Sequence, residues 1–554
     1  MKYFLLLIIC CTFWNVSGQN LYLKIDSKNA LENKIIDSVA YTKKHSNLES
    51  LNNEVDLLTN KITKIGFMDL KKINDKKLND STYIYTLDFG EQIKFIDLYI
   101  KEVSILKKLK IFVAENDTLR LPYSTIENYL QQYIAGLEKN GYSLSKLKLI
   151  NIVRSNNNLS AEIGVTIDQK RTVNGIVIKG YDKFPEGFKK QINKKFNKTV
   201  FNKDNLKNIY NDFNKIRFIK QTKYPEILFT TDTTQIYVTI EKAKRNTFDG
   251  FIGFANDDNR KLIFNGYIDL SLTNALNNGE KLDLYWKSDG KNQKTFNILA
   301  DVPYIFKSPL GVKAQLNIFK QDSIFQNTKT NLELGYLINF NTKTYLGYQE
   351  TESNDINNLN TNILADLRNS FVTTALEYAN FATDDILFPN KTLINLKIGT
   401  GQRNTKTRND KQYFVNLDLN HHFYLNKKFA VNLKSQNYFL GSNNYLTNEQ
   451  YRFGGINSIR GFNENSLQAN TFLSLITELQ YVVSNAFYFH TVLDYGYFDD
   501  KATKKSDKLL GLGFGIGIIN KNGLLKFIYS NGSSQNQAIK FSNSIVQISL
   551  TTNF

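Results

Sequence analysis

The sequence predicts a multidomain protein, with three α+β domains of β-α-α-β-β order followed by a 16-stranded antiparallel transmembrane β-barrel. Two observations predict this division. Residues 20–245 mix short strands with helices whose apolar residues recur every three or four positions. From about residue 246 this pattern gives way to 8–13-residue segments of alternating polar and apolar residues, separated by Asn, Asp, Gly and Lys turns. That alternation is typical of a membrane barrel.

Residues 1–18 have the form of a secretory signal. Lys2 precedes an apolar stretch, and the small residue Gly18 follows it, so we expect cleavage after Gly18. Both cysteines of the chain, Cys10 and Cys11, lie in this segment. The exported protein is therefore expected to have neither disulfides nor thiolate metal sites.

The composition favours an exported barrel over a nucleic-acid-binding protein. At 554 residues the chain is too long for a single core, and its aromatic content is 13% with only 6 Pro. The net charge of +18 is spread along the chain and comes mostly from Lys. No nucleic-acid-reading motif accompanies it, so compositional bias and attraction to anionic lipid or lipopolysaccharide explain it better. No later segment reaches the roughly 20 apolar residues of a spanning helix.

We place the three α+β domains at 19–89, 90–170 and 171–245. The third is the clearest, because Lys203–Lys215 has the i, i+3, i+4, i+7 spacing of a half-buried helix. A turn-then-strand pattern opens both the second and the third domain, which indicates a tandem array. The expected helices are 48–65, 124–138, 187–193 and 203–215, and the expected strands are 67–73, 82–89, 92–99, 145–153, 159–168, 172–179, 226–230 and 235–241.

The barrel domain is expected to span 246–554. Closure satisfies the backbone hydrogen bonds of every strand, which allows a sheet to lie in hydrocarbon. The alternation is clearest in the last strand, which ends at Phe554. The predicted strands are 247–254, 262–272, 279–288, 294–302, 311–320, 328–339, 342–351, 370–382, 391–403, 411–424, 429–440, 470–481, 487–497, 509–519, 523–531 and 544–554.

Strand parity predicts where the loops lie. If the N-terminal domains are periplasmic, connections after odd strands face outward, and the two long ones, 352–369 and 441–469, both do so. The Gly-rich stretch YRFGGINSIRGF, residues 451–462, then lies in the sixth outward loop. Alternation also turns Glu478 and Asp494 into the lumen from neighbouring strands.

We hypothesise that the sixth loop folds into the barrel and places Arg460 against Glu478 and Asp494. A guanidinium engages a carboxylate through two parallel hydrogen bonds, which Lys cannot reproduce. The spacing alone is also compatible with an exposed loop arginine and two solvated lumen acids.

Five motifs in order carry a family resemblance: GGINSIRGF, ITELQY, VLDYG, GLGFGIGI and a terminal strand that ends in Phe. Together they resemble the BamA/TamA-type outer-membrane assembly factors of the bacterial surface antigen superfamily. The resemblance implies that the α+β repeats are polypeptide-transport-associated (POTRA) domains. Three such domains are similar to TamA rather than to the usual five of BamA.

The resemblance also implies roles for individual residues. Arg460, Gly461 and Phe462 correspond to the family's RG-aromatic motif at the tip of the sixth loop, with Glu478 and Asp494 as its lumen partners. Ile459 stands where valine is more usual.

The function implied is a non-enzymatic factor of the cell outer membrane, with periplasmic N-terminal domains, that inserts unfolded outer-membrane proteins. The first and last strands would form a weak seam. Gly250 and Gly253 pack poorly in the first strand, although they could instead only relieve curvature, and Phe554 ends the last. Expected partners are client proteins, lipid and lipopolysaccharide, with a periplasm-spanning or lipoprotein partner possible and no nucleic acid.

The alternative is a two-partner-type secretion transporter that exports a dedicated protein through the barrel. A Pro-rich linker or an N-terminal plug helix would favour this alternative, and the sequence shows neither. An enzyme is not expected, because the chain has no GxSxG, HExxH or phosphate-loop motif. Cofactors and metals are not expected either, since the four histidines lack ligand-like spacing. The pair His421–His422 is predicted to be a solvated strand end.

Overall fold

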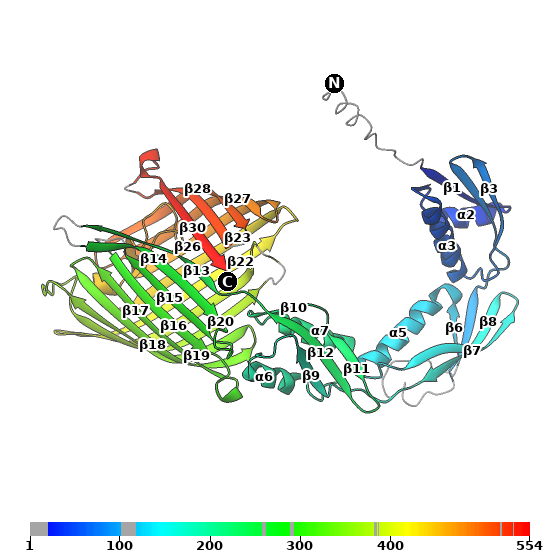
Figure 1. Ribbon diagram of the computed structural model, residues 1–554, viewed down its shortest axis with the longest axis horizontal. Coiled ribbons are helices and arrows are strands. Elements are labelled where there is room, and N and C mark those ends of the chain that lie inside the picture. The colour runs from blue at the N-terminus through cyan, green and yellow to red at the C-terminus, as the bar shows by residue number, and fades with distance from the viewer. Residues whose placement is uncertain are drawn as a thin grey trace, which may run out of the picture. The chain divides into compact units, whose positions relative to one another are not determined.

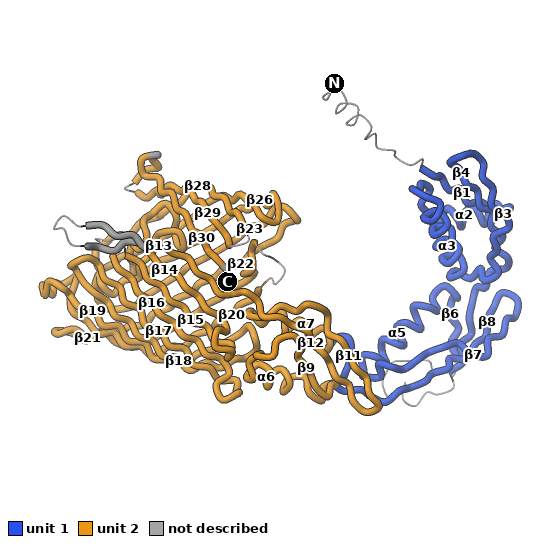
Figure 2. The backbone as a smooth tube through the Cα atoms, in the orientation of Figure 1, with its two compact units in different colours: residues 1–172, 200–204 blue, residues 173–199, 205–554 orange. Residues whose placement is uncertain are grey.

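The computed structural model describes residues 20–100, 118–256, 262–288, 293–381, 385, 387–520, 523–535 and 537–553. The predicted signal at 1–18 and the terminal Phe554 lie outside these residues. The chain divides into two compact units, Met1–Thr172 with Val200–Asp204 and Val173–Thr199 with Asn205–Phe554 (Figure 2). Within the described ranges, no helix is both long and apolar enough to cross a membrane.

The first sheet has the strand order β2-β1-β4-β3, with β1 parallel to β4. Its helix α3 buries Leu51, Val55, Leu58 and Ile62 against the sheet, a stripe at helical spacing. Asn47 caps this helix by accepting a hydrogen bond from the Ser50 N–H. The elements are β1 (Leu21–Ser27), α2 (Ala30–Val39), β2 (Lys44–His45), α3 (Leu48–Lys64), β3 (Lys71–Asn79) and β4 (Thr82–Asp88).

The second sheet has the order β6-β5-β8-β7 and again a central parallel pair, β5 with β8. Its helix buries Tyr133 and Leu137 against the sheet. Strand β6 was not expected from the sequence. The elements are β5 (Phe95–Tyr99), β6 (Thr118–Pro122), η1 (Tyr123–Thr125), α5 (Ile126–Lys139), β7 (Lys146–Ser155) and β8 (Asn158–Thr166).

The third sheet is organised around β12, which pairs with β9 in parallel and with β10 and β11 antiparallel. The short β10 is an addition to the predicted β-α-α-β-β order. The elements are β9 (Gly175–Lys179), α6 (Glu186–Phe196), α7 (Lys203–Asn214), β10 (Ile219–Gln221), β11 (Glu226–Phe229) and β12 (Thr234–Lys242).

The C-terminal part forms a closed antiparallel barrel of sixteen strands, which confirms the predicted count and class (Figure 1). Each predicted segment overlaps one strand. The strands are β13 (Thr247–Asn256), β14 (Leu262–Thr273), β15 (Lys281–Ser288), β16 (Gln293–Val302), β17 (Leu310–Gln321), β18 (Phe325–Asn339), β19 (Thr342–Asp355), β20 (Leu367–Phe381), β21 (Asn390–Thr405), β22 (Asn409–Tyr424), β23 (Phe429–Gly441), β26 (Thr471–Ser484), β27 (Phe487–Asp500), β28 (Lys505–Asn520), β29 (Gly523–Ser533) and β30 (Ile545–Asn553).

Apolar side chains cover the outside of the barrel. On β26 the exposed residues Leu473, Leu475 and Leu479 alternate with the inward Ser474 and Gln480. This outward apolar surface is what hydrocarbon requires. We call the end where β12 leads into β13 the proximal end, and the opposite end the distal end.

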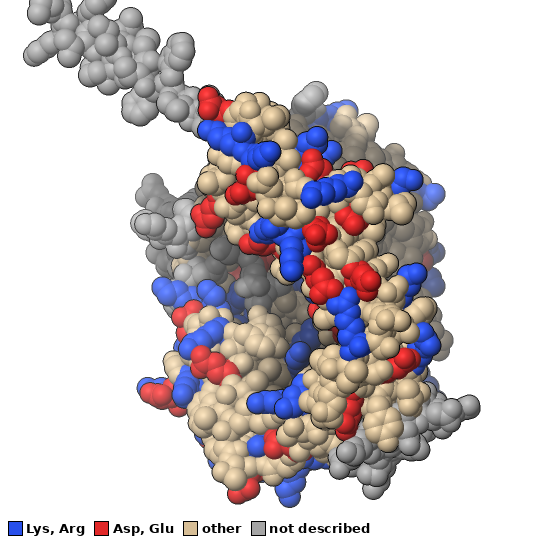
Figure 3. Space-filling model, turned by 90° about the vertical axis from the view of Figure 1, so that its right-hand side faces the viewer, with Lys and Arg blue, Asp and Glu red and all other residues tan. Residues whose placement is uncertain are grey.

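Positive charge is not gathered into one patch on the face drawn in Figure 3, where Lys and Arg side chains lie among Asp and Glu side chains.

Candidate functional site

Loop 6, residues 442–470 between β23 and β26, folds into the barrel at its distal end. It contains η3 (Thr447–Glu449) and a small hairpin of β24 (Tyr451–Phe453) and β25 (Leu467–Ala469). Phe453 of the hairpin stacks on Phe472 of the barrel wall, with 3.9 Å between ring centroids. Ile459 and Phe462 belong to the same buried cluster. Burial of these residues fixes the loop to the inner wall.

Arg460 is held by both predicted acids. Its Nε and Nη2 donate to the two carboxylate oxygens of Asp494 at 2.8 and 2.6 Å, and its Nη1 donates to Glu478 Oε1 at 2.5 Å. The backbone N–H of Arg460 adds a bond to Asp494 Oδ2 at 2.9 Å, and Nη2 also reaches the Thr477 carbonyl at 3.2 Å. The side chains are 2% exposed for Arg460, 0% for Asp494 and 19% for Glu478. The structure thus brings these three residues into one buried, bidentate centre.

Glycines allow the loop tip to lie directly on the wall. Gly461 has φ +88°, and a Cβ there would lie 2.3 Å from the backbone nitrogen of Gly532 on β29. A Cβ on Gly511 of β28 would lie 2.4 Å from the Arg460 carbonyl oxygen. The GLGFGIGI motif therefore supplies part of the flat floor under the RG-aromatic tip, while Phe462 packs beside it.

The sequence reasoning missed a second buried arginine. Arg403 of β21 contacts Asp410 of β22 and Glu449 of loop 6 through separate guanidinium nitrogens. All three side chains are at most 5% exposed. One signal was available in the sequence. Arg403 lies two residues after Gly401, so strand alternation places both on the same, inward face.

The seam between β13 and β30 is the least paired contact of the barrel wall. It has two register pairs, Thr247 with Asn553 and Phe248 with Thr552, and one side-chain bond, from Thr552 Oγ1 to the Phe248 carbonyl at 2.6 Å. By contrast β13 forms ten pairs with β14, and β30 forms eight with β29. Between the described ranges 249–256 and 545–551, no register pair joins the two strands.

The predicted seam glycines lie in β13 and pair with β14. Gly250 is opposite Ile268, and Gly253 is opposite Asn265. A Cβ on Gly250 would lie 2.5 Å from the Tyr267 carbonyl oxygen, so this glycine permits close pairing with β14. The third predicted seam residue, Phe554, lies outside the described residues.

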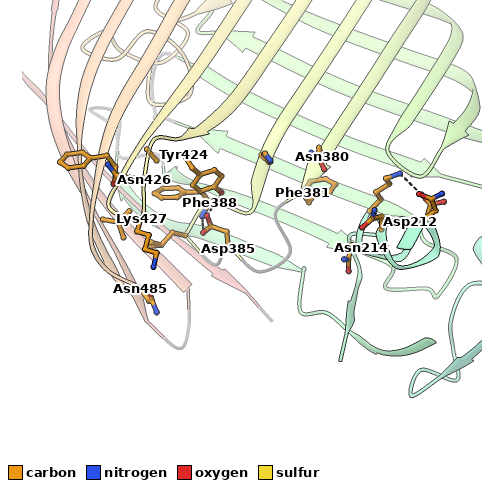
Figure 4. A pocket seen from close by; sticks show the side chains of 18 of the residues that line it. Asp212, Asn214, Asn380, Phe381, Asp385, Phe388, Tyr424, Asn426, Lys427 and Asn485 are labelled. Carbon is orange, nitrogen blue, oxygen red and sulfur yellow. Dashed lines mark hydrogen bonds and ion pairs between the residues drawn. The ribbon is translucent and has the colours of Figure 1, made fainter. Parts of the chain in front are cut away.

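The proximal mouth holds a cavity of about 1210 Å³ between the third α+β domain and the barrel turns (Figure 4). Asp212 lies on its domain side and accepts bonds from Lys195 at 2.6 Å and Lys215 at 2.8 Å. On its barrel side the Tyr424 hydroxyl donates to Asp385 at 2.6 Å. Both kinds of charge therefore line the mouth, together with apolar residues such as Phe381 and Phe388.

Aromatic packing joins the third domain to the barrel turns. The ring of Phe188 on α6 lies 4.6 Å from that of Tyr304, and a Cβ on Gly279 would lie 2.2 Å from Phe188. The Tyr181 hydroxyl donates to Asn277 Oδ1 at 2.9 Å. Burial raises the pKa of the Tyr304 hydroxyl above its usual range, as expected for a neutral group in an apolar junction.

The expectation that both histidines of the 421–422 pair are solvated is wrong for His422. Its ring is buried and stacks on Phe388, which precedes β21, with 4.3 Å between ring centroids. Among the described residues, no group of three or more His, Cys, Asp or Glu side chains could hold a metal ion.

The comparisons with known proteins agree with this architecture. Residues 319–518 match the family described as "Haemolysin secretion/activation protein ShlB/FhaC/HecB". No curated protein sequence matches the chain.

Three solved structures are similar. CdiB from Escherichia coli has a TM-score of 0.51 at 14% identity, with 91% of this chain and 97% of that chain covered. CdiB from Acinetobacter baumannii has a TM-score of 0.49 at 14% identity, with the same coverage. BamA from Haemophilus ducreyi lacking POTRA domains 1–3 has a TM-score of 0.49 at 13% identity, with 82% and 99% covered. The likeness to Escherichia coli CdiB shows a shared fold, and a barrel of this type implies an outer-membrane location.

Proposed function

We propose that the protein assembles outer-membrane proteins by opening its seam sideways and offering free strand edges to clients. The observation that carries this proposal is the pairing of β13 with β30, which consists of two register pairs at the proximal end. The unpaired lengths of both strands leave backbone donors and acceptors that an extended client strand could satisfy. Client folding supplies the free energy, and no cofactor, metal or nucleotide takes part.

The α+β domains at 19–89, 90–170 and 171–245 would act as periplasmic POTRA domains that hold extended clients. Support comes from edge strands that present unpaired backbone and exposed side chains. On β11, an edge of the third sheet, Ile227 and Leu228 are exposed. Strand addition at such an edge binds a chain largely through its backbone, so clients of different sequence could be accepted. A closer likeness to TamA stays a prediction.

The centre at Arg460, Glu478 and Asp494 would brace the barrel from inside, with Gly461 and Phe462 seating the tip. Removing one partner of a buried pair leaves the others uncompensated, so breaking this brace would be costly. The partners we propose are unfolded outer-membrane proteins and the lipid and lipopolysaccharide of the membrane. A periplasm-spanning or lipoprotein partner would link the domains to other machinery.

A second function, secretion of a dedicated protein through the lumen, is favoured by the family match over residues 319–518. That family is described by haemolysin secretion and activation, and the match covers strands β18 to β27, loop 6 and most of β28. This function requires displacement of loop 6 rather than opening of the seam.

A disulfide across the seam distinguishes the two functions. Phe248 and Thr552 are register partners on the outer face, so the pair F248C and T552C should lock the seam. A matched lock, L376C with L396C, joins outward register partners of β20 and β21. Each variant is placed in proteoliposomes, and folding of a defined client barrel is followed by its heat-modifiable mobility on gels.

Seam opening predicts that insertion stops in the oxidised seam lock, returns with reductant and persists in the control lock. Equal insertion by both oxidised variants would contradict the proposal. Secretion through the lumen predicts that export of a cargo survives the seam lock.

A further inference from the structure

The first limb of loop 6, residues 442–453, is held to the barrel by a charge centre whose polarity is the reverse of that at the tip. At the tip the loop supplies the cation and the wall supplies the acids. In the second centre the wall supplies Arg403, and the loop supplies Glu449. Arg403 Nη1 also donates to the Asn444 carbonyl at 3.2 Å, so the same guanidinium binds the limb at two places.

Both carboxylate oxygens of Glu449 accept hydrogen bonds. Its Oε1 accepts from the Leu446 N–H at 2.9 Å, and its Oε2 accepts from Gln412 Nε2 at 2.9 Å and from Asn369 Nδ2 at 3.4 Å. A buried carboxylate that is this fully bonded is costly to remove from its site, because every donor would lose its partner.

The neighbouring residue extends the attachment to more strands. Asn448 Nδ2 donates to Ser353 Oγ on β19 at 2.6 Å, and Asn327 Nδ2 on β18 donates to the Asn448 carbonyl at 2.6 Å. Residues 446–449 are therefore bonded to five consecutive strands, β18 to β22.

The tip segment, residues 456–466, is attached partly through ion pairs that are more exposed to solvent than those of the limb. Its partner Glu478 is 19% exposed, whereas no side chain of the Arg403 centre exceeds 5%. On the far side of the lumen Glu464 contacts Lys287 and Tyr285 of β15, and both basic and acidic members of that contact are about one-third exposed. Water thus reaches the tip contacts more easily than the limb contacts, which lowers the free energy of local opening there.

A flexible joint separates the two segments. Gly454 and Gly455 have φ +102° and +99°, a region that favours glycine, and they follow β24 directly. Rotation at these two residues can move the tip without disturbing the limb.

We infer that Arg403 and Glu449 are positioning residues that keep the first limb of loop 6 on the wall while the Arg460 tip is released, so that loop 6 opens as a flap hinged at Gly454–Gly455. The lumen then opens beside residues 442–453 rather than by loss of the whole loop. The inference concerns the loop itself, and its test needs no client, so it can fail while the proposed insertion function stands.

Thiol accessibility tests the flap. Both native cysteines lie in the predicted signal, and two buried positions serve as single-cysteine reporters: S458C on the tip segment and L446C on the limb. The purified full chain in detergent is treated with a water-soluble maleimide, and the labelling rate is measured in three backgrounds. These are Arg460→Gln, Glu449→Gln and the control Arg408→Gln, which alters an exposed arginine in the turn after β21.

In the Arg408→Gln background both reporters should label slowly. Arg460→Gln should speed labelling of S458C at least about tenfold through local opening and leave L446C slow. Glu449→Gln, unlike Arg460→Gln, should speed labelling of L446C. Faster labelling of L446C in Arg460→Gln would overturn the inference, because the limb would then leave with the tip. A slow L446C in Glu449→Gln would overturn it too, because Glu449 would then not hold the limb.

A milder variant covers the case in which Glu449→Gln does not assemble into a heat-modifiable barrel. Arg403→Lys keeps the positive charge but loses the planar fork that reaches Asp410 and Glu449 together. Labelling of L446C should then be faster than in Arg408→Gln. An unchanged rate would count against a tether at Arg403.

Discussion

The seam and the wall beneath loop 6 are two parts of one barrel that are held very differently. The seam has two register pairs, whereas β26 and β27 form eleven and have the Arg460 centre laid across them. Closure of a barrel therefore does not require an even ladder around its circumference. Separation of strands is expected to start at the seam, and the buried ion pairs make it hardest on the wall that carries the loop tip.

The largest expected effect comes from breaking the braced wall at its centre. Arg460→Ala leaves Asp494 buried without its cation and should lower the free energy of unfolding by about 3–5 kcal/mol. Arg460→Lys should lose less, since it keeps the charge but not the bidentate geometry. The temperature at which the heat-modifiable band converts on gels measures this loss. The exposed Arg408→Ala is the control, and equal conversion temperatures for Arg460→Ala and Arg408→Ala would refute the brace.

A smaller effect is expected from adding a methyl group at Gly511, on which the tip of loop 6 rests. In Gly511→Ala the new Cβ would meet the Arg460 carbonyl oxygen at 2.4 Å, so the tip must shift, at a cost of about 1–3 kcal/mol. Gly175→Ala is a matched control, because a Cβ at Gly175 of β9 meets no atom within 4 Å. Protease cleavage of loop 6 should become faster in Gly511→Ala alone. Identical cleavage in both variants would show that the tip does not rest on this glycine.

The difference between the two regions also marks what the sequence could predict. Period-2 alternation located every barrel strand, because a strand with one face in lipid and one in the lumen must alternate. The same alternation predicted that Glu478 and Asp494 face inward, and the motif around Arg460 identified that arginine as their partner. Helical stripes in the N-terminal part likewise predicted its α+β class, because a half-buried helix must repeat its apolar residues every three or four positions.

Contacts made by irregular backbone could not be predicted. Glu449 lies 46 residues from Arg403, in a loop whose path has no periodic pattern, so the inward position of Arg403 could not identify its loop partner. His422 was predicted to be solvated because nothing in its own strand shows that Phe388 from a neighbouring turn covers it. The register of the seam was not predictable either. Glycines pointed to β13, but the shortness of its pairing with β30 depends on how the barrel closes.

The smallest change gives the most direct test of the comparison. Thr552 Oγ1 donates to the Phe248 carbonyl across the seam at 2.6 Å, and Thr477 Oγ1 donates to the Leu493 carbonyl across β26 and β27 at the same distance. Replacing either by the similarly shaped Val removes one hydrogen bond, worth about 0.5–1.5 kcal/mol. The two variants should therefore differ little in the temperature at which the barrel unfolds.

They should differ in where the barrel opens. Thr552→Val removes a bond from a contact that has two register pairs, so amide hydrogen exchange over 247–256 should become faster. Thr477→Val removes the same bond at the end of an unbroken run of seven register pairs, from Thr471 to Thr477, so exchange over 247–256 should stay unchanged. If Thr552→Val leaves exchange in β13 as slow as Thr477→Val does, the seam is not the weak contact and client insertion must begin elsewhere on the barrel.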